Sequence, residues 1–294
     1  MKILVVCGLI LAAVESSSHA QDPYADTVIS YVPGTGQSAS YENSSAALGA
    51  PSSVASITAP AFGNTNIVGI GNGGELTLGF NTPVLNDPGG HAEGMDFTIF
   101  GNEFFVLGSN GISGIYDHTG LSVWVSEDNI TYYELNSTTG ADDLFPSEGS
   151  GDPGLPVNPA LALSSFVGLT PAQALSLYDG SGGGASYSIS WADNTSGQPV
   201  DLPSISYVRI EGTGGYGYVD AVARAESVPE PAEGYMALIG IGALIFPRWR
   251  GKRAGHGRPP STRSRLNAEL ISARCVNACG KFPMAAPSEL VCSA

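Results

Sequence analysis

The chain has 294 residues and a formal charge of −15 at pH 7. The charge is unevenly placed, because residues 21 to 226 hold 22 acidic side chains and only two basic ones, Arg209 and Arg224, which gives −20 for this region. A surface of this sign repels phosphate groups and anionic lipid, so nucleic acid and anionic membranes are excluded as partners of this region.

The N-terminus has the layout of a secretory signal peptide. Lys2 precedes an apolar segment from Ile3 to Val14, and the small-residue site Ser18-His19-Ala20 follows it. This order predicts export, with cleavage between Ala20 and Gln21. We therefore expect residues 1-20 to be a signal peptide and residues 21-226 to be an acidic exported domain.

The exported domain contains no cysteine, since all four cysteines lie in the signal peptide or beyond residue 270. A hydrophobic core must therefore hold it together without disulfides. At roughly 200 residues the region is long enough for one domain with a sizeable core.

Residues 21-226 are rich in Gly, Ser, Thr and Asn, with short apolar segments between turn residues, which is typical of an all-β domain. In the segment Glu75 to Phe80 every second residue is apolar, the pattern of a strand with one buried face. We expect a jelly-roll-type antiparallel β-sandwich. The expected strands are Glu75 to Phe80, Met95 to Phe100, Leu121 to Ser126, Tyr132 to Leu135, Tyr187 to Trp191, Tyr207 to Glu211 and Val219 to Ala225.

One short helix is expected within this domain. Thr170 is placed as its N-cap, Pro171 occupies the first helical position, and the helix continues to about Tyr178. Asp128-Asn129 predicts a hairpin turn, because Asn tolerates a positive φ. Arg209 alternates with apolar neighbours in a very acidic domain, so we expect it to pair with a carboxylate.

Metal binding has two candidate locations. The acidic loop from Thr138 to Pro159 could wrap Ca²⁺, an ion that takes six to eight oxygen ligands, although a solvated loop explains the same composition. The candidate calcium ligands are Asp142, Asp143, Glu148 and Asp152. A second candidate group is His91 with Asp87, Glu93 and Asp96. No other cofactor is expected.

The domain carries no sequence motif for catalysis. There is no G-x-S-x-G, H-E-x-x-H or P-loop sequence, and His91 and His118 have no recognisable partner. Paired carboxylates of a glycosidase cannot be placed from sequence. We therefore expect a non-catalytic protein, with a secreted carbohydrate-active enzyme of β-sandwich type as the alternative.

The C-terminal part combines three signals. Val228-Pro229-Glu230-Pro231 is followed by an apolar run from Tyr235 to Phe246 and by a basic cluster. The cluster consists of Arg248, Arg250, Lys252 and Arg253. The two prolines favour an extended backbone suited to a processing site, and the basic cluster favours a cytoplasmic end.

This tripartite order resembles the PEP-CTERM sorting domain of exported proteins in Gram-negative bacteria that make extracellular polysaccharide. The resemblance implies that residues 227-253 form a sorting and anchor segment whose Val228-Pro229-Glu230-Pro231 motif is recognised by an exosortase, a membrane-embedded processing enzyme. A helix over Tyr235 to Phe246 rises only about 18 Å, against a hydrocarbon core of about 30 Å. We therefore expect a short apolar helix with transient inner-membrane contact followed by processing.

Members of that family usually end at the basic cluster, whereas this chain continues through residues 254-294. This basic tail shows neither strand alternation nor a sustained helical period. We expect it to be disordered, or to result from a shifted or extended reading frame.

The exported domain is similar to discoidin or galactose-binding-like modules. The similarity is carried by GELTLGF from Gly74, VWVSEDNITYYEL from Val123, and YVRIEG from Tyr207. It implies that loops or aromatic side chains could bind sugar, with rings stacking on a pyranose and Asp or Asn accepting from hydroxyl groups. The aromatic candidates are Tyr116, Trp124, Tyr132, Tyr133, Trp191, Tyr216 and Tyr218, and Tyr216 and Tyr218 stand out because they lie in a glycine-rich loop.

Together these features favour an exported cell-surface or extracellular-matrix protein of a Gram-negative bacterium. We expect it to be sorted through its C-terminus and to associate with exopolysaccharide.

Overall fold

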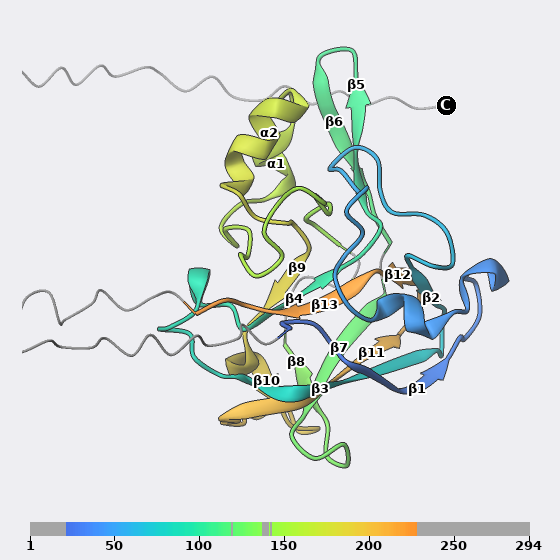
Figure 1. The fold of residues 1–294 in the computed structure, drawn as a ribbon, viewed down its shortest axis with the longest axis vertical. Coiled ribbons are helices and arrows are strands. Elements are labelled where there is room, and N and C mark those ends of the chain that lie inside the picture. Colours follow the sequence, from blue (N-terminus) through green and yellow to red (C-terminus); the bar gives the residue numbers. More distant parts are fainter. Residues whose placement is uncertain (1–21, 119, 137–140, 142, 228–294) are drawn as a thin grey trace, which may run out of the picture. The chain divides into compact units, whose positions relative to one another are not determined.

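The computed structural model describes residues 22–118, 120–136, 141 and 143–227 (Figure 1). Thirteen strands and two α-helices lie in these ranges. The strands are β1 (Thr27–Val32), β2 (Val68–Ile70), β3 (Glu75–Leu85), β4 (Phe97–Phe100), β5 (Phe104–Gly108), β6 (Gly111–Tyr116), β7 (Leu121–Ser126), β8 (Tyr133–Leu135), β9 (Ala185–Tyr187), β10 (Ala192–Asp193), β11 (Ser204–Gly212), β12 (Gly217–Val219) and β13 (Ala221–Arg224). The helices are α1 (Leu163–Phe166) and α2 (Pro171–Tyr178).

The domain is built from antiparallel sheets with few helices, as the composition predicts. The largest sheet has the order β1-β3-β11-β7-β8-β10, and a three-stranded sheet has the order β13-β4-β9. Two smaller ribbons pair β12 with β2 and β5 with β6.

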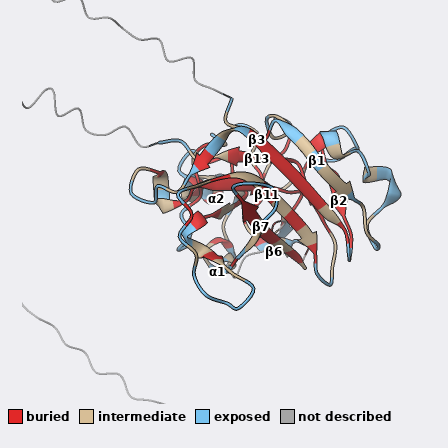
Figure 2. Ribbon diagram, turned by 90° about the horizontal axis from the view of Figure 1, so that it is seen from below, coloured by how far each residue is buried: buried red, intermediate tan, exposed pale blue. Residues whose placement is uncertain are grey.

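The main hydrophobic core takes side chains from both of the larger sheets, which therefore face each other across it. Leu76, Val123 and Val208 come from the six-stranded sheet, and Phe97 and Val222 come from the three-stranded one. Figure 2 shows the buried residues concentrated on these strands. Each fully buried side chain of this size contributes about 1.5–3 kcal/mol to folding.

A second, smaller core forms under the β5–β6 hairpin and the two helices. Phe105 and Ile112 from the hairpin pack with Phe166 of α1 and Tyr178 of α2. The rings of Phe105 and Phe166 lie 4.9 Å apart between centroids. Residues 104–116 and 163–178 therefore pack on this second core and do not belong to the two larger sheets.

Several elements agree closely with the sequence expectation. The alternating segments form β3 and β7, and Leu76, Leu78 and Phe80 are buried on one face as expected. Helix α2 begins after the N-cap Thr170, whose side chain accepts a hydrogen bond from Gln173 N. Asn129 has φ 60° in the β7–β8 turn.

The expected strand from Tyr187 to Trp191 is wrong beyond its first residue. Strand β9 ends at Tyr187, and a short 3-10 helix follows over Ile189–Trp191. The backbone N–H of Ile189 donates to the carboxylate of Asp96 at 2.7 Å, so it is withdrawn from strand pairing.

The expected strand from Val219 to Ala225 is also divided. Strand β12 ends at Val219 and β13 begins at Ala221. Asp220 between them donates its backbone N–H to Phe100 O at 2.7 Å, and its side chain accepts from Ser52 N. The chain thereby passes from one sheet to another at a buried carboxylate. The short helix α1 and the strands β1, β2, β5, β6 and β10 were not expected from the sequence.

Candidate functional site

The register of three strands places Trp124, Glu134 and Asp193 in one row across the six-stranded sheet. Trp124 of β7 lies opposite Glu134 of β8, and Glu134 lies opposite Asp193 of β10. Residues directly opposite in antiparallel strands point to the same face, and neighbouring strands lie about 4.8 Å apart. The row therefore crosses the outer face of the sheet, because Val123 and Val125 beside Trp124 point into the core.

These side chains line a pocket of about 460 Å³, referred to below as the Trp124 pocket. Asn136 and Asn194 add two side-chain amides to its lining. The other lining residues are Leu135, Thr195 and Gly197. Its volume lies within the range of about 300–1,000 Å³ that is usual for sites binding small molecules.

Local hydrogen bonds hold the polar groups of the pocket in place. The indole Nε1–H of Trp124 donates to Ser122 Oγ at 3.1 Å, which orients the ring. Asn136 Nδ2 donates to Asp193 Oδ2 at 3.2 Å. Asn194 Oδ1 accepts from the backbone N–H groups of Ser196 and Gln198. Asn194 therefore stabilises the turn after β10 and also lines the pocket.

The row continues past Trp124 to Arg209 on β11, which lies opposite it. Arg209 Nε lies 3.6 Å from Glu75 Oε2, and its Nη1 lies 3.6 Å from Glu211 Oε1. The guanidinium carbon also lies 3.6 Å from the centroid of the Tyr132 ring. Burial raises the pKa of the Tyr132 hydroxyl and that of the Glu211 carboxyl, while Arg209 opposes both shifts. The expected pairing of Arg209 with a carboxylate is confirmed.

The Trp124 pocket combines an aromatic ring with carboxylate and amide groups. A ring of this kind stacks on the apolar face of a pyranose, while Asp, Glu and Asn side chains exchange hydrogen bonds with hydroxyl groups. Trp124 is among the aromatic candidates found in the sequence. Its polar neighbours could not be found that way, because Glu134 and Asp193 are brought together only by strand register.

Tyr216 and Tyr218, the favoured sugar contacts from the sequence, belong to a different group of rings. The His118 ring lies 4.8 Å from that of Tyr216 and 5.2 Å from those of Tyr218 and Tyr116. The ring of Tyr41 also packs edge-on against that of Tyr218, with centroids 5.2 Å apart. The side chain of Tyr218 is only 8% exposed, so its faces are covered by protein, whereas Tyr216 is half-buried.

Two of the candidate calcium ligands accept hydrogen bonds from groups two residues further along the chain. Glu148 Oε1 accepts from Ser150 Oγ at 2.6 Å, and Asp152 Oδ1 accepts from Gly154 N at 2.9 Å. Asp143 is half-buried, and Asp142 lies outside the described residues. Within the described ranges no group of three or more His, Cys, Asp or Glu side chains could hold a metal ion.

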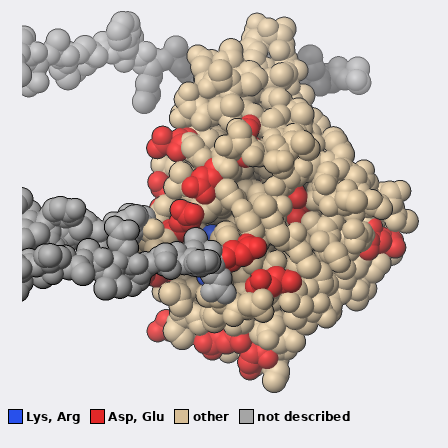
Figure 3. Space-filling model, in the orientation of Figure 1, with Lys and Arg blue, Asp and Glu red and all other residues tan. Residues whose placement is uncertain are grey.

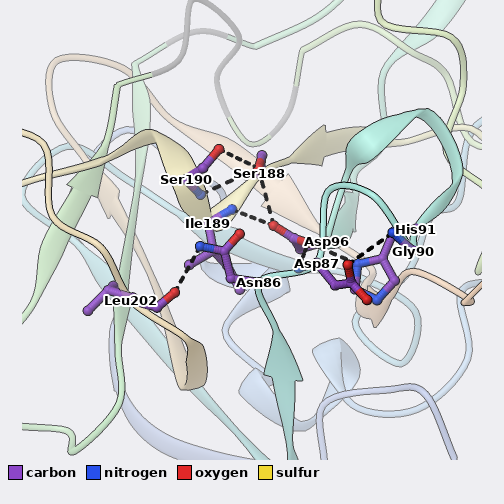
Figure 4. A network of polar contacts seen from close by, with 9 residues as sticks. All are labelled: Asn86, Asp87, Gly90, His91, Asp96, Ser188, Ile189, Ser190 and Leu202. Atoms are coloured by element: carbon purple, nitrogen blue, oxygen red, sulfur yellow. Dashed lines mark hydrogen bonds and ion pairs between the residues drawn. The ribbon is translucent and has the colours of Figure 1, made fainter.

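His91 and Asp96 form a buried pair that ties a loop to the three-stranded sheet (Figure 4). His91 Nδ1 lies 2.9 Å from Asp96 Oδ1, which also accepts from Asp87 N at 3.0 Å. Asp96 Oδ2 accepts from Ile189 N and from Ser188 Oγ. Asp87 caps its own turn through Gly90 N. Both carboxylates are thus used to fix the loop, and this group has a structural role.

The sorting motif at Val228-Pro229-Glu230-Pro231, the signal cleavage site at Ala20 and Gln21, the apolar run and the basic cluster all lie outside the described residues. Within the described part of the chain, no helix has the length and apolar character needed to cross a membrane.

Comparison with known proteins adds no family assignment. No family model matches the chain. A search of curated proteins also finds no match. The structure of the described residues therefore defines the class of this protein. It is a domain of antiparallel β-sheets with a polar pocket on the outer face of the largest sheet.

Proposed function

We propose that this chain is a non-catalytic exported protein that binds extracellular polysaccharide through the Trp124 pocket. The observation that carries the proposal is the row of Trp124, Glu134 and Asp193 on one face, with Asn136 and Asn194 beside it. We further propose that the antiparallel sheets form a jelly-roll-type sandwich of the galactose-binding-like kind, which agrees with the face-to-face packing of the two larger sheets.

The choice of a neutral saccharide follows from charge. Glu134 and Asp193 line the pocket, and the Arg209 side chain next in the row is already engaged by Glu75 and Glu211. An anionic sugar would therefore meet two carboxylates with no available cation among the described residues of the lining, whereas neutral hydroxyl groups can donate to both. Neutral polysaccharide is the ligand class that this pocket favours.

Affinity electrophoresis tests this proposal with neutral polysaccharides such as galactomannan, galactan and a soluble cellulose derivative in the gel. We expect at least one of them to retard the protein, and Trp124→Ala to weaken that binding by at least about tenfold, or 1.4 kcal/mol. Tyr216→Ala is the matched control, since it removes a half-buried ring from the other aromatic group. Loss of retardation in Tyr216→Ala with normal retardation in Trp124→Ala would place the ligand elsewhere and overturn the assignment.

A glycoside-cleaving enzyme is the second candidate, because two carboxylates line the same pocket. Glu134 and Asp193 lie side by side on neighbouring strands and point to the same face, and glycoside cleavage uses a pair of carboxylates. Glu134 is solvent-exposed, however, whereas general acids of glycosidases are ordinarily held in apolar surroundings. Release of reducing ends from a polysaccharide that binds, lost in both Glu134→Gln and Asp193→Asn, would favour the enzyme.

Export and sorting complete the proposal. The order of signals in the sequence supports export through residues 1-20, recognition of Val228-Pro229-Glu230-Pro231 by an exosortase-type enzyme, transient inner-membrane contact, and release to the cell surface or matrix. Calcium remains a proposal for the acidic loop of residues 142–152. Mass spectrometry of the mature protein tests the sorting step. A C-terminus close to Pro231 supports it, and a chain that still ends at Ala294 contradicts it.

A further inference from the structure

A second pocket lies where the described part of the chain ends. It has a volume of about 260 Å³, and Arg224, Ala225 and Ser227 from that end line it. Leu85, which is 58% exposed, adds an apolar wall. The carboxylate of Asp96 also lines the pocket, but its two oxygens are already engaged by four hydrogen-bond partners (Figure 4). We call this site the Arg224 pocket.

Arg224 brings an incompletely bonded guanidinium to this pocket. It is one of only two basic side chains in residues 21–226, and acidic side chains are spread over the face shown in Figure 3 while basic ones occupy little of it. Its Nη2 donates to the backbone O of Asp22 at 2.9 Å. Its Nε is buried and has no hydrogen-bond partner among the described residues. A buried donor without an acceptor costs free energy, so an anionic acceptor in the pocket would stabilise the fold.

The described carboxylates nearest in sequence do not neutralise this guanidinium. Arg209 lies beside two carboxylates, whereas no ion pair to Arg224 occurs among the residues that the structure describes. Asp22 Oδ1 accepts from a backbone N–H two residues further along the chain. The side chain of Glu226 packs over Gly154. The charge of Arg224 is therefore open to a carboxylate from elsewhere.

Hydrogen bonds hold the end of the described chain against the pocket. The backbone N–H of Ala225 donates to Asp96 O at 2.9 Å, and Ser227 forms an antiparallel bridge with His91. The next residue in the sequence is Val228, the first residue of the sorting motif. The domain therefore fixes the point from which this motif begins, at the rim of a pocket that contains a cation.

We propose that the Arg224 pocket binds the carboxylate of Glu230 from the same chain. Glu230 follows Ser227 by three residues, and an extended chain of this length spans about 10 Å. The prolines at 229 and 231 restrict the backbone on both sides of Glu230, so binding costs less conformational entropy.

The tether favours Glu230 over a free anion. A short flexible linker gives an effective concentration in the millimolar range, and it holds the ligand beside the site. A free anion must instead approach a domain with a formal charge of −20, which repels it. The apolar wall at Leu85 also suits a proline ring next to the bound carboxylate.

This contact has a consequence for sorting, which rests on the proposed function. A motif whose carboxylate is held by the domain becomes available to an exosortase-type enzyme only when Arg224 releases it. If the motif is bound two-thirds of the time, Arg224→Gln should raise the rate of C-terminal processing in cells about threefold. Pulse labelling followed by mass measurement gives this rate.

The Nε–H resonance of Arg224 tests the contact itself in the full-length chain, without any processing enzyme. Comparison with Arg224→Lys assigns it. We expect Glu230→Gln to shift this resonance, because the substitution removes the charged acceptor. Glu233→Gln is the matched control, since it removes the same charge three residues further along and outside the motif. Equal shifts in the two variants, or a shift in neither, would overturn the proposal.

Titration with sodium acetate, against sodium chloride at equal ionic strength, separates the chain's own carboxylate from a free one. In Glu230→Gln the Arg224 resonance should respond to acetate with an apparent affinity at least about threefold higher than in wild type, where Glu230 competes. A wild type that responds as strongly as Glu230→Gln would assign the pocket to a free carboxylate and overturn the intramolecular contact. Failure of C-terminal processing in cells leaves these resonances unchanged, so the two failures are distinguishable.

Discussion

Asp220 is a buried carboxylate at the point where the chain leaves one sheet and enters another. Its side chain is 2% exposed, and its Oδ2 accepts from Ser52 N at 2.8 Å. Burial raises the pKa of this carboxyl to about 7, and the hydrogen bond from Ser52 opposes the shift. The folded protein therefore binds a proton at Asp220 more tightly than the unfolded chain does.

The contribution of Asp220 to stability is fully present below about pH 4 and is lost as the pH rises to about 7. Asp220→Asn removes this titration while the amide oxygen can still accept from Ser52 N. We expect the variant to gain up to about 4 kcal/mol relative to wild type between pH 4 and pH 8. Urea unfolding at several pH values measures the difference, and a pH-independent difference would contradict it.

Among the elements, helix α2 shows how a short sequence pattern specifies a boundary. Thr170 Oγ1 accepts from Gln173 N, and Gln173 Oε1 accepts from Thr170 N at 2.9 Å, so the two residues form a capping box. Asp179 then ends the helix in a left-handed conformation. Because Ala174 and Tyr178 are buried in the second core, the cap also helps to hold α2 against that core.

Removing the cap should loosen this element. We expect Thr170→Ala to destabilise the domain by about 1 kcal/mol, since the backbone N–H of Gln173 loses its acceptor and Gln173 Oε1 loses the Thr170 hydroxyl donor. Hydrogen exchange of the α2 amides, together with thermal unfolding, measures the change. Ser176→Ala is the control on the same helix, because its exposed hydroxyl bonds only to Ala172 O in the described structure. Equal effects of the two substitutions would refute the capping role.

For the whole molecule, local patterns predicted the architecture better than the site. Alternation identified β3 and β7, and the Thr170-Pro171 pair identified α2, because these signals are local in sequence. The ends of β9 and β12 depended on the distant groups Asp96 and Ser52, which no local pattern contains.

The candidate site depended on register in the same way. Trp124 could be named as an aromatic candidate, but Glu134 and Asp193 join it only when β8 pairs with both β7 and β10. The glycine-rich loop around Tyr216 suggested solvent-exposed rings, yet four other rings, those of Tyr41, Tyr116, His118 and Tyr218, form one contact network with it. Sequence alone contains no signal for such packing.

The central claim is that neutral polysaccharide binds over the ring of Trp124. The indole N–H resonance of Trp124, assigned by comparison with Trp124→Phe, reports on this directly during titration with a polysaccharide that retards the protein. We predict that it shifts saturably, with the same apparent affinity as the electrophoretic retardation. An unchanged Trp124 resonance at saturating polysaccharide would contradict the account.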